Sequence, residues 1–232
     1  MRDINELFML NEETLDNDEL KYLIETLENI VSKDKNNIDN INHLQHCCKI
    51  YLYNNYDNNI KIKLDVEFPD SMINNNINKT DSIIFELAPI DLVPYSIFYF
   101  LRLIDNWEGG SFFRNAGHVK QVKYYNTKMK SLAFQEYSSE FPHIKYSLGF
   151  AGRPGGPQFY ISTRDNTVNH GPGSQGSLTE ADSCFAKINL NDINSINTVN
   201  NISFQPGKNK SGFIMEKKDW INIISITKIN NI

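Results

Sequence analysis

A series of short strand-like segments, separated by turn-forming residues, limits the folds that this chain can adopt. In residues 60–67, apolar and charged side chains alternate, which is typical of a strand with one buried face. Strand character continues in the segments 82–87, 111–115, 118–124, 146–151, 158–163, 184–190 and 220–229. Helices are expected at 94–104, where Pro94 follows Asp91, and at 192–199. Eight strands and two helices predict a mainly β fold, a closed eight-stranded antiparallel barrel with two capping helices, because closure leaves no unpaired edge.

The N-terminal part has a helical period instead. Apolar residues recur every three or four positions up to Val31, and Asp16 or Asp18 can cap the first turn of this helix. A second, weaker helical pattern covers residues 38–48. The predicted units are an N-terminal helical hairpin, residues 1–57, and a barrel domain, residues 58–232. The apolar stripe of the hairpin must be covered, either by the barrel or by a protein partner that binds the hairpin.

Composition and charge disfavour several classes of function. The 232-residue chain has a net charge of −5 and no stripe of basic residues, which argues against a nucleic-acid partner. No stretch is long and apolar enough to cross a membrane, and no early segment has the pattern of a secretion signal. The cysteines are odd in number, and the adjacent Cys47 and Cys48 are poorly placed to bridge each other. We therefore expect a cytoplasmic protein without nucleic-acid or membrane partners.

Four short sequence segments carry the most specific information about fold and function. They are Phe85-Glu86-Leu87 followed by the helix that starts at Pro94, Phe112-Phe113-Arg114 followed by Gln121, Leu148-Gly149-Phe150-Ala151 followed by Gln158-Phe159-Tyr160-Ile161, and Cys184-Phe185-Ala186-Lys187-Ile188. In this order, over roughly residues 60–229, they resemble the cyclophilin family of peptidyl-prolyl cis-trans isomerases. The resemblance implies the barrel described above, a site for proline-containing peptides or proteins, and no cofactor or metal.

The resemblance assigns catalysis to Arg114, and the chemistry of the reaction suits that residue. An X-Pro bond rotates over a barrier of roughly 18–20 kcal/mol because the nitrogen lone pair is shared with the carbonyl. A guanidinium that donates toward the prolyl nitrogen, or that stabilises the twisted carbonyl, would weaken the partial double bond. The reaction needs neither a proton transfer nor a covalent intermediate, so His118 is not required as a base.

The other site residues are expected to form an apolar slot for the proline ring and polar contacts to the flanking amides. Either Phe112 or Phe113 would line the slot. Gln158 and Tyr160 share one face of their strand, because side chains alternate along a strand. The predicted substrate-binding residues are Phe112, Phe113, His118, Val119, Gln121, Ala151, Gly152, Gln158, Tyr160, Leu178, Asp182 and Phe185.

Several residues depart from the family pattern. His118 and Val119 stand where the family usually has a large aromatic residue and a methionine, and Gly152 replaces a common asparagine. Asp182 replaces a histidine, and the tryptophan that is frequent in the preceding loop is absent. These differences leave two alternatives to an active isomerase: a proline-peptide binding module with little turnover, and a structural scaffold.

Two other motifs have simpler explanations. Residues 171–176 read G-x-G-x-x-G, but they follow a polar loop and precede no crossover helix, so we expect a flexible flap rather than a dinucleotide site. His43, His46, Cys47 and Cys48 lie close together on the second helix. Because no second ligand pair has a standard spacing elsewhere, we expect helix surface and buried thiols there rather than a metal site.

Overall fold

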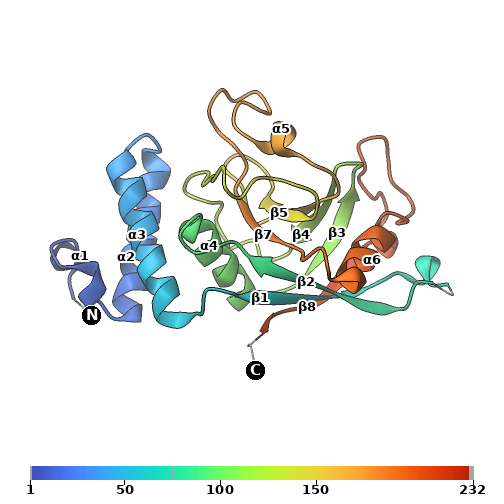
Figure 1. The fold of residues 1–232 in the computed structure, drawn as a ribbon, viewed down its shortest axis with the longest axis horizontal. Helices are drawn as coiled ribbons and strands as arrows, with labels where there is room; N and C mark the ends of the chain where they lie inside the picture. Colours follow the sequence, from blue (N-terminus) through green and yellow to red (C-terminus); the bar gives the residue numbers. More distant parts are fainter. Residues whose placement is uncertain (1, 75, 230–232) are drawn as a thin grey trace.

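The barrel predicted from the strand pattern is present and closed. The structure, a computed structural model, describes residues 2–74 and 76–229, and Figure 1 shows their arrangement. Within these residues the strands are β1 (Lys61–Glu67), β2 (Thr80–Leu87), β3 (Gly110–Asn115), β4 (Val119–Tyr124), β5 (Ser147–Phe150), β6 (Phe159–Ser162), β7 (Cys184–Lys187) and β8 (Ile221–Ile229). They close in the order β1-β2-β7-β5-β6-β4-β3-β8, and all neighbours are antiparallel. The mainly β, eight-stranded antiparallel barrel is therefore confirmed.

Two helices lie against the barrel on different sides, as Figure 1 shows. Helix α4 (Pro94–Asp105) begins with proline, whose missing N–H costs nothing in the first turn, and most of its side chains are buried. Its Phe100 ring lies 4.4 Å, centroid to centroid, from the ring of Phe185. Helix α6 (Ile193–Ile202) contacts β2, where the Ser195 hydroxyl accepts a hydrogen bond from the Ile84 amide at 2.7 Å.

The N-terminal segment forms the predicted helical hairpin, with two short elements before it. These are α1 (Ile4–Leu7) and the 3₁₀ turn η1 (Glu12–Thr14), and the hairpin consists of α2 (Asn17–Lys33) and α3 (Ile38–Asn55). Asp16 caps α2 in a capping box with Glu19. Helix α3 extends past the predicted end at residue 48, because its last turns pack on α4, with the Tyr51 and Phe98 rings in edge contact at 5.2 Å.

The apolar stripe of the hairpin is covered by the chain itself. Leu20, Leu23 and Leu27 of α2 are fully buried and belong to the same hydrophobic cluster as the barrel core. The junction also contains a bidentate ion pair, in which Arg102 of α4 donates to both carboxylate oxygens of Glu28 at 2.6 and 2.7 Å. Docking on the barrel domain, one of the two expected alternatives, is therefore sufficient to bury this face.

The connecting segments differ from expectation in detail. Residues 178 and 179 form a bend, next to which the Ser177 hydroxyl accepts a hydrogen bond from the Glu180 amide at 3.0 Å. The predicted flap at 171–176 is anchored, because Arg153 donates two hydrogen bonds to Ser174. The remaining short elements are α5 (Thr167–His170), η2 (Asp70–Met72) and η3 (Lys217–Asp219). Among the described residues, no helix has the length and apolar character needed to cross a membrane.

Candidate functional site

Arg114, Gln121 and Gln158 form one hydrogen-bonded row across the outside of the barrel. Arg114 lies opposite Gln121 in the β3–β4 ladder, and Gln158 directly precedes β6. The Arg114 Nη1 donates to Gln121 Oε1 at 3.1 Å, and Gln121 Nε2 donates to Gln158 Oε1 at 2.9 Å. Three side chains that the sequence nominated separately are thus brought into contact.

A β-bulge directs Arg114 to the outer face. Phe112 pairs with Val122, whereas Arg114 pairs with Gln121, so the register shifts between Phe112 and Arg114 and Phe113 is the extra residue. Strict alternation would put Arg114 on the same face as Phe112, which is fully buried in the core. The bulge reverses this, and the guanidinium lies outside beside Gln121.

A small apolar patch lies beside this row. Ala116, Val119 and Tyr160 form a hydrophobic cluster separate from the main core, with the half-buried Ala151 packed against it. We call these four residues the outer patch. Tyr160 is on the opposite face of β6 from Phe159, whose ring packs inside the barrel. Tyr160 pairs with Gln121, the partner of Arg114, so the predicted slot residues Val119 and Tyr160 are close to the predicted catalytic arginine, together with Ala151, which was predicted as a backbone contact.

The loop that follows α6 holds the Arg114 side chain. Arg114 Nε donates to the Ser211 carbonyl at 3.2 Å, and the guanidinium carbon lies 5.0 Å from the centroid of the Phe213 ring. Main-chain hydrogen bonds join this loop to β3, because the Gly212 carbonyl accepts from the Asn115 amide at 2.7 Å. Nε and one Nη1 hydrogen are thereby used within the chain. In the described part of the chain, Nη2 has no hydrogen-bond partner and is left for another ligand.

Gly212 allows this loop to come so close. It has a φ of +83°, and a Cβ at that position would lie 2.7 Å from the main chain of Ala116. The loop 203–215 therefore covers one end of the outer patch. Val119 and Tyr160 are each only 2% exposed, so the patch is largely closed in this conformation.

His118 and the backbone of Ala151 and Gly152 border the outer patch. The His118 ring is half-buried, 5.8 Å from the ring of His170, and burial followed by the nearby charges of His170 and Arg114 lowers its pKa. The Ala151 carbonyl accepts from the Gly156 amide at 3.2 Å. Gly152 has a φ of +95°, which explains a glycine there, and its carbonyl accepts from a glutamine side chain.

A buried polar network lies directly beneath Tyr160. The Tyr160 hydroxyl donates to Asp182 Oδ2 at 3.0 Å and also lies 3.0 Å from His170 Nδ1. His170 Nδ1 contacts the same carboxylate oxygen at 2.5 Å, and Arg153 Nε donates to Oδ1 at 2.9 Å. A fifth member, His143, is bonded through Nε2 to the Asp182 carbonyl at 2.8 Å. This arrangement locks the orientation of the Tyr160 ring.

The protonation states follow from burial and pairing. Burial would raise the pKa of Asp182, but the hydrogen bonds from His170, Arg153 and Tyr160 lower it overall, so the carboxylate stays charged. Burial lowers the pKa of His143 to about 4, so this ring is neutral near pH 7. Burial and the adjacent Asp182 charge raise the pKa of Tyr160 well above its usual range. The floor of the outer patch is thus a neutral phenol held by a buried anion.

Five of the predicted substrate-binding positions lie elsewhere. Phe112 and Phe185 point into the barrel core, because the face of β3 and β7 that carries them is the inner one. Phe113, the bulged residue, packs against Phe213 and Trp220 and does not belong to the outer patch. Leu178 is 94% exposed on a loop and contributes no wall to the slot.

Asp182 is the fifth of these positions. It is 1% exposed, and both of its oxygens are bonded inside the chain, because a buried carboxylate needs donors to offset its lost hydration. Asp182 therefore supports Tyr160 from below instead of facing a ligand.

Sequence reasoning missed four neighbours of the site. His143, His170 and Arg153 belong to the buried network, and Phe213 covers Arg114. The aspartate at position 182 was the available signal, since a carboxylate next to a buried strand requires a cationic partner. Which of the distant histidines and arginines would supply it depends on how the loops fold back.

No protein-family model matches the chain, and no curated protein matches it either.

Proposed function

We propose that this protein is a peptidyl-prolyl cis-trans isomerase of the cyclophilin type, acting on X-Pro bonds of peptides and proteins. The observation that carries the proposal is the row Arg114, Gln121 and Gln158 beside the outer patch, on the outside of a closed eight-stranded barrel. This combination supplies an oriented cation and an apolar surface within one site. The reaction requires no other chemical group, since it transfers neither a proton nor an electron.

The proposed role of Arg114 is electrostatic. Twisting the X-Pro bond returns the lone pair to the prolyl nitrogen and leaves a carbonyl that is no longer conjugated with it. The Nη2 group of Arg114 is the donor placed to interact with this altered amide, while Nε and Nη1 are held by Ser211 and Gln121. The Gln121 contact lies outside the loop that contains Ser211, so it can keep the guanidinium oriented when a peptide displaces part of that loop. An oriented cation needs little reorganisation in the transition state.

The proposed role of the other residues is to hold the peptide. The proline ring would rest on Tyr160, Val119 and Ala116, displacing part of the loop 203–215 that covers them. Gln158 and Gln121 present amide groups that can bond the peptide backbone on either side of the ring. Burial of apolar area would stabilise the bound proline ring. Hydrogen bonds to the two glutamine side chains would fix the direction in which the peptide runs along the site.

The state of the cysteines supports a proposal for the compartment. All three are free and buried, which suits a reducing environment, and we place the protein in the cytoplasm.

The test is exchange spectroscopy by NMR, or a protease-coupled assay, on a short Ala-Pro peptide with wild type and Arg114→Ala. We expect turnover in wild type and a loss of roughly 100-fold in kcat/KM in the variant, the size found when one oriented donor is removed from a transition state. Equal turnover in both proteins would refute the proposal.

Two further variants test whether the geometry of the Arg114 guanidinium matters, or only its positive charge. Arg114→Lys keeps the charge but loses the planar fork, so we expect it to remain close to Arg114→Ala. Arg164→Ala removes an exposed arginine from a neighbouring loop and should retain wild-type turnover. Circular dichroism on each variant establishes that the barrel is intact.

One observation favours the binding module as a second candidate. The Arg114 guanidinium is held against Phe213, and the outer patch is largely closed, so a peptide must open the site before the arginine acts on it. If opening is unfavourable, peptides bind without rapid exchange. Tight binding of a proline peptide by calorimetry, with no catalysed exchange in the same sample, would favour this candidate over the enzyme.

A further inference from the structure

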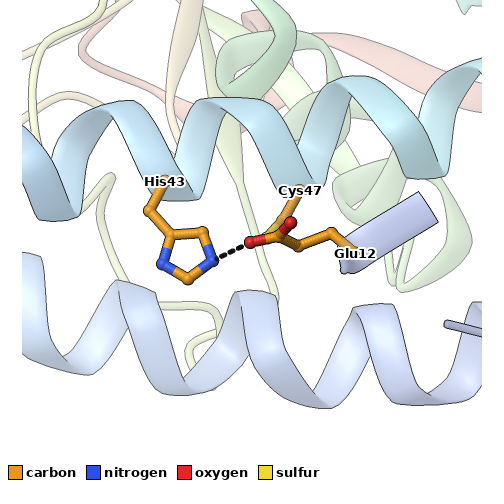
Figure 2. A group of neighbouring side chains, drawn as sticks. All are labelled: Glu12, His43 and Cys47. Carbon is orange, nitrogen blue, oxygen red and sulfur yellow. Dashed lines mark ion pairs between the residues drawn. The ribbon is translucent and has the colours of Figure 1, made fainter. Parts of the chain in front are cut away.

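A group of three side chains lies far from the outer patch, where the N-terminal segment meets the hairpin. His43 and Cys47 are four residues apart on α3 and therefore share one face of the helix. Glu12 comes from η1, which crosses that face. Figure 2 shows the imidazole, the thiol and the carboxylate directed toward one another between α3 and η1.

The distances suit a shared ion. His43 Nε2 lies 2.8 Å from Glu12 Oε1, and all three potential ligand atoms lie within 4.8 Å of one another. A tetrahedral zinc ion with bonds of roughly 2.0–2.3 Å needs ligand atoms roughly 3.4–3.6 Å apart. Small side-chain rotations would reach this spacing. The His43–Glu12 pair has to open from 2.8 Å, and because no separation exceeds 4.8 Å, none has to close by more than about 1.4 Å.

The present contacts leave two of these groups without good partners. His43 Nε2 is buried and, within the described part of the chain, accepts or donates no hydrogen bond of acceptable geometry, despite its closeness to Glu12. The Cys47 side chain is fully buried and forms no disulfide. Among the described residues, the imidazole nitrogen thus has only the poorly aligned carboxylate of Glu12 as a partner, and the buried thiol has none of its own. Imidazole, thiolate and carboxylate together are ligands that zinc binds in proteins.

We propose that Glu12, His43 and Cys47 bind a divalent zinc-class metal ion that fastens the N-terminal segment to the hairpin. On binding, the Cys47 thiol gives its proton to water as the sulfur–metal bond forms, and a water molecule completes the four ligands. The expectation from the sequence was helix surface and buried thiols rather than a metal site, because no second ligand pair has a standard spacing elsewhere in the chain. The third ligand lies 31 positions before His43, where only folding brings it close.

The test uses the full-length protein, freed of metal by a chelator and titrated with Co²⁺ and then Zn²⁺. We expect one equivalent of Co²⁺ to bind with a thiolate-to-cobalt charge-transfer absorption, and Zn²⁺ to abolish that absorption by displacement. Cys47→Ser and His43→Gln should each weaken Co²⁺ binding by at least about 100-fold, more than the loss of an outer-shell group causes. Zn²⁺ should also raise the melting temperature of wild type and leave that of His43→Gln unchanged.

Two matched controls lie on the same helix. His46→Gln removes an exposed histidine that is outside the cluster, and Cys48→Ala removes a buried thiol that is also outside it. Both should bind Co²⁺ like wild type. Absence of the charge-transfer absorption in wild type, or binding by His43→Gln within twofold of wild type, overturns the proposal. Because His43 is partly exposed, His43→Gln provides this test even if Cys47→Ser fails to fold.

Discussion

The inside and the outside of the barrel are built from the same strands but are held together by different forces. Inside, Phe159, Phe185 and Phe100 form an aromatic cluster without polar partners. Outside, Tyr160 is the neighbour of Phe159 in sequence, yet its position depends on hydrogen bonds to a buried carboxylate. The interior is specified by volume and apolar area, whereas the candidate site is specified by partners that must each be present.

The largest expected effect on stability comes from Phe185→Ala, which tests the packing of the barrel interior. The Phe185 ring lies 4.4 Å from the rings of both Phe100 and Phe150, so truncation leaves a cavity and should lower the free energy of unfolding by roughly 3–5 kcal/mol. Urea unfolding monitored by circular dichroism measures this. Leu178→Ala, at a residue that is 94% exposed, should change the free energy by less than about 0.5 kcal/mol. If Phe185→Ala left stability unchanged and abolished peptide binding, Phe185 would belong to the slot after all.

The second test measures how the free energy of unfolding depends on pH. The aromatic cluster inside the barrel has no titratable groups to contribute to this dependence, whereas the buried polar network does. The pKa of His143 is lowered by burial from its usual 6.5 to about 4, so the unfolded chain binds a proton between these values that the folded protein excludes. Stability must therefore fall as the pH drops through this window, by about 2 kcal/mol between pH 7 and pH 5.

The control for this test is His143→Gln, whose amide can still donate to the Asp182 carbonyl. Its unfolding free energy should lack this part of the pH dependence. Asp182 does not obscure the comparison, because its pKa is lowered and its contribution is lost only below about pH 4. An identical pH slope in wild type and variant would show that His143 is accessible to protons in the folded state.

A third, smaller effect is expected from Tyr160→Phe. The change keeps the ring of the outer patch but removes the hydroxyl that donates to Asp182, and should cost about 1.5 kcal/mol of unfolding free energy. Peptide affinity should fall as well, because the ring loses its fixed orientation. Phe159→Tyr would be the reverse change on the inner face. It should be more damaging to stability, since the added hydroxyl would enter the aromatic core without a partner.

The smallest effect is expected from Phe213→Ala. The contact of this half-exposed ring with the Arg114 guanidinium should contribute only about 0.5–1 kcal/mol to stability. Its influence on function should be clearer, because removing the ring removes a contact that holds the Arg114 guanidinium in place. Isothermal titration with a proline peptide and the exchange assay together measure this. A loss of both binding and turnover would instead make Phe213 a contact for the peptide.

Much of the fold could be predicted because its signals are local. Alternation in residues 60–67 and the proline at the start of α4 depend on neighbours in sequence, and the resulting elements are those observed. The end of α3 was predicted too early because its last turns are supported by Tyr51 packing on Phe98, a contact between separate helices.

What the sequence by itself determined was the set of strands, their alternating faces and the residue types of the site, including Arg114, Gln121, Gln158 and Tyr160. Only the tertiary structure decided that the bulge at Phe113 turns Arg114 outward and that Asp182 lies beneath Tyr160. The reason is physical: backbone periodicity acts between near neighbours, whereas a one-residue register shift and the pairing of a buried charge depend on strands and loops distant in the chain.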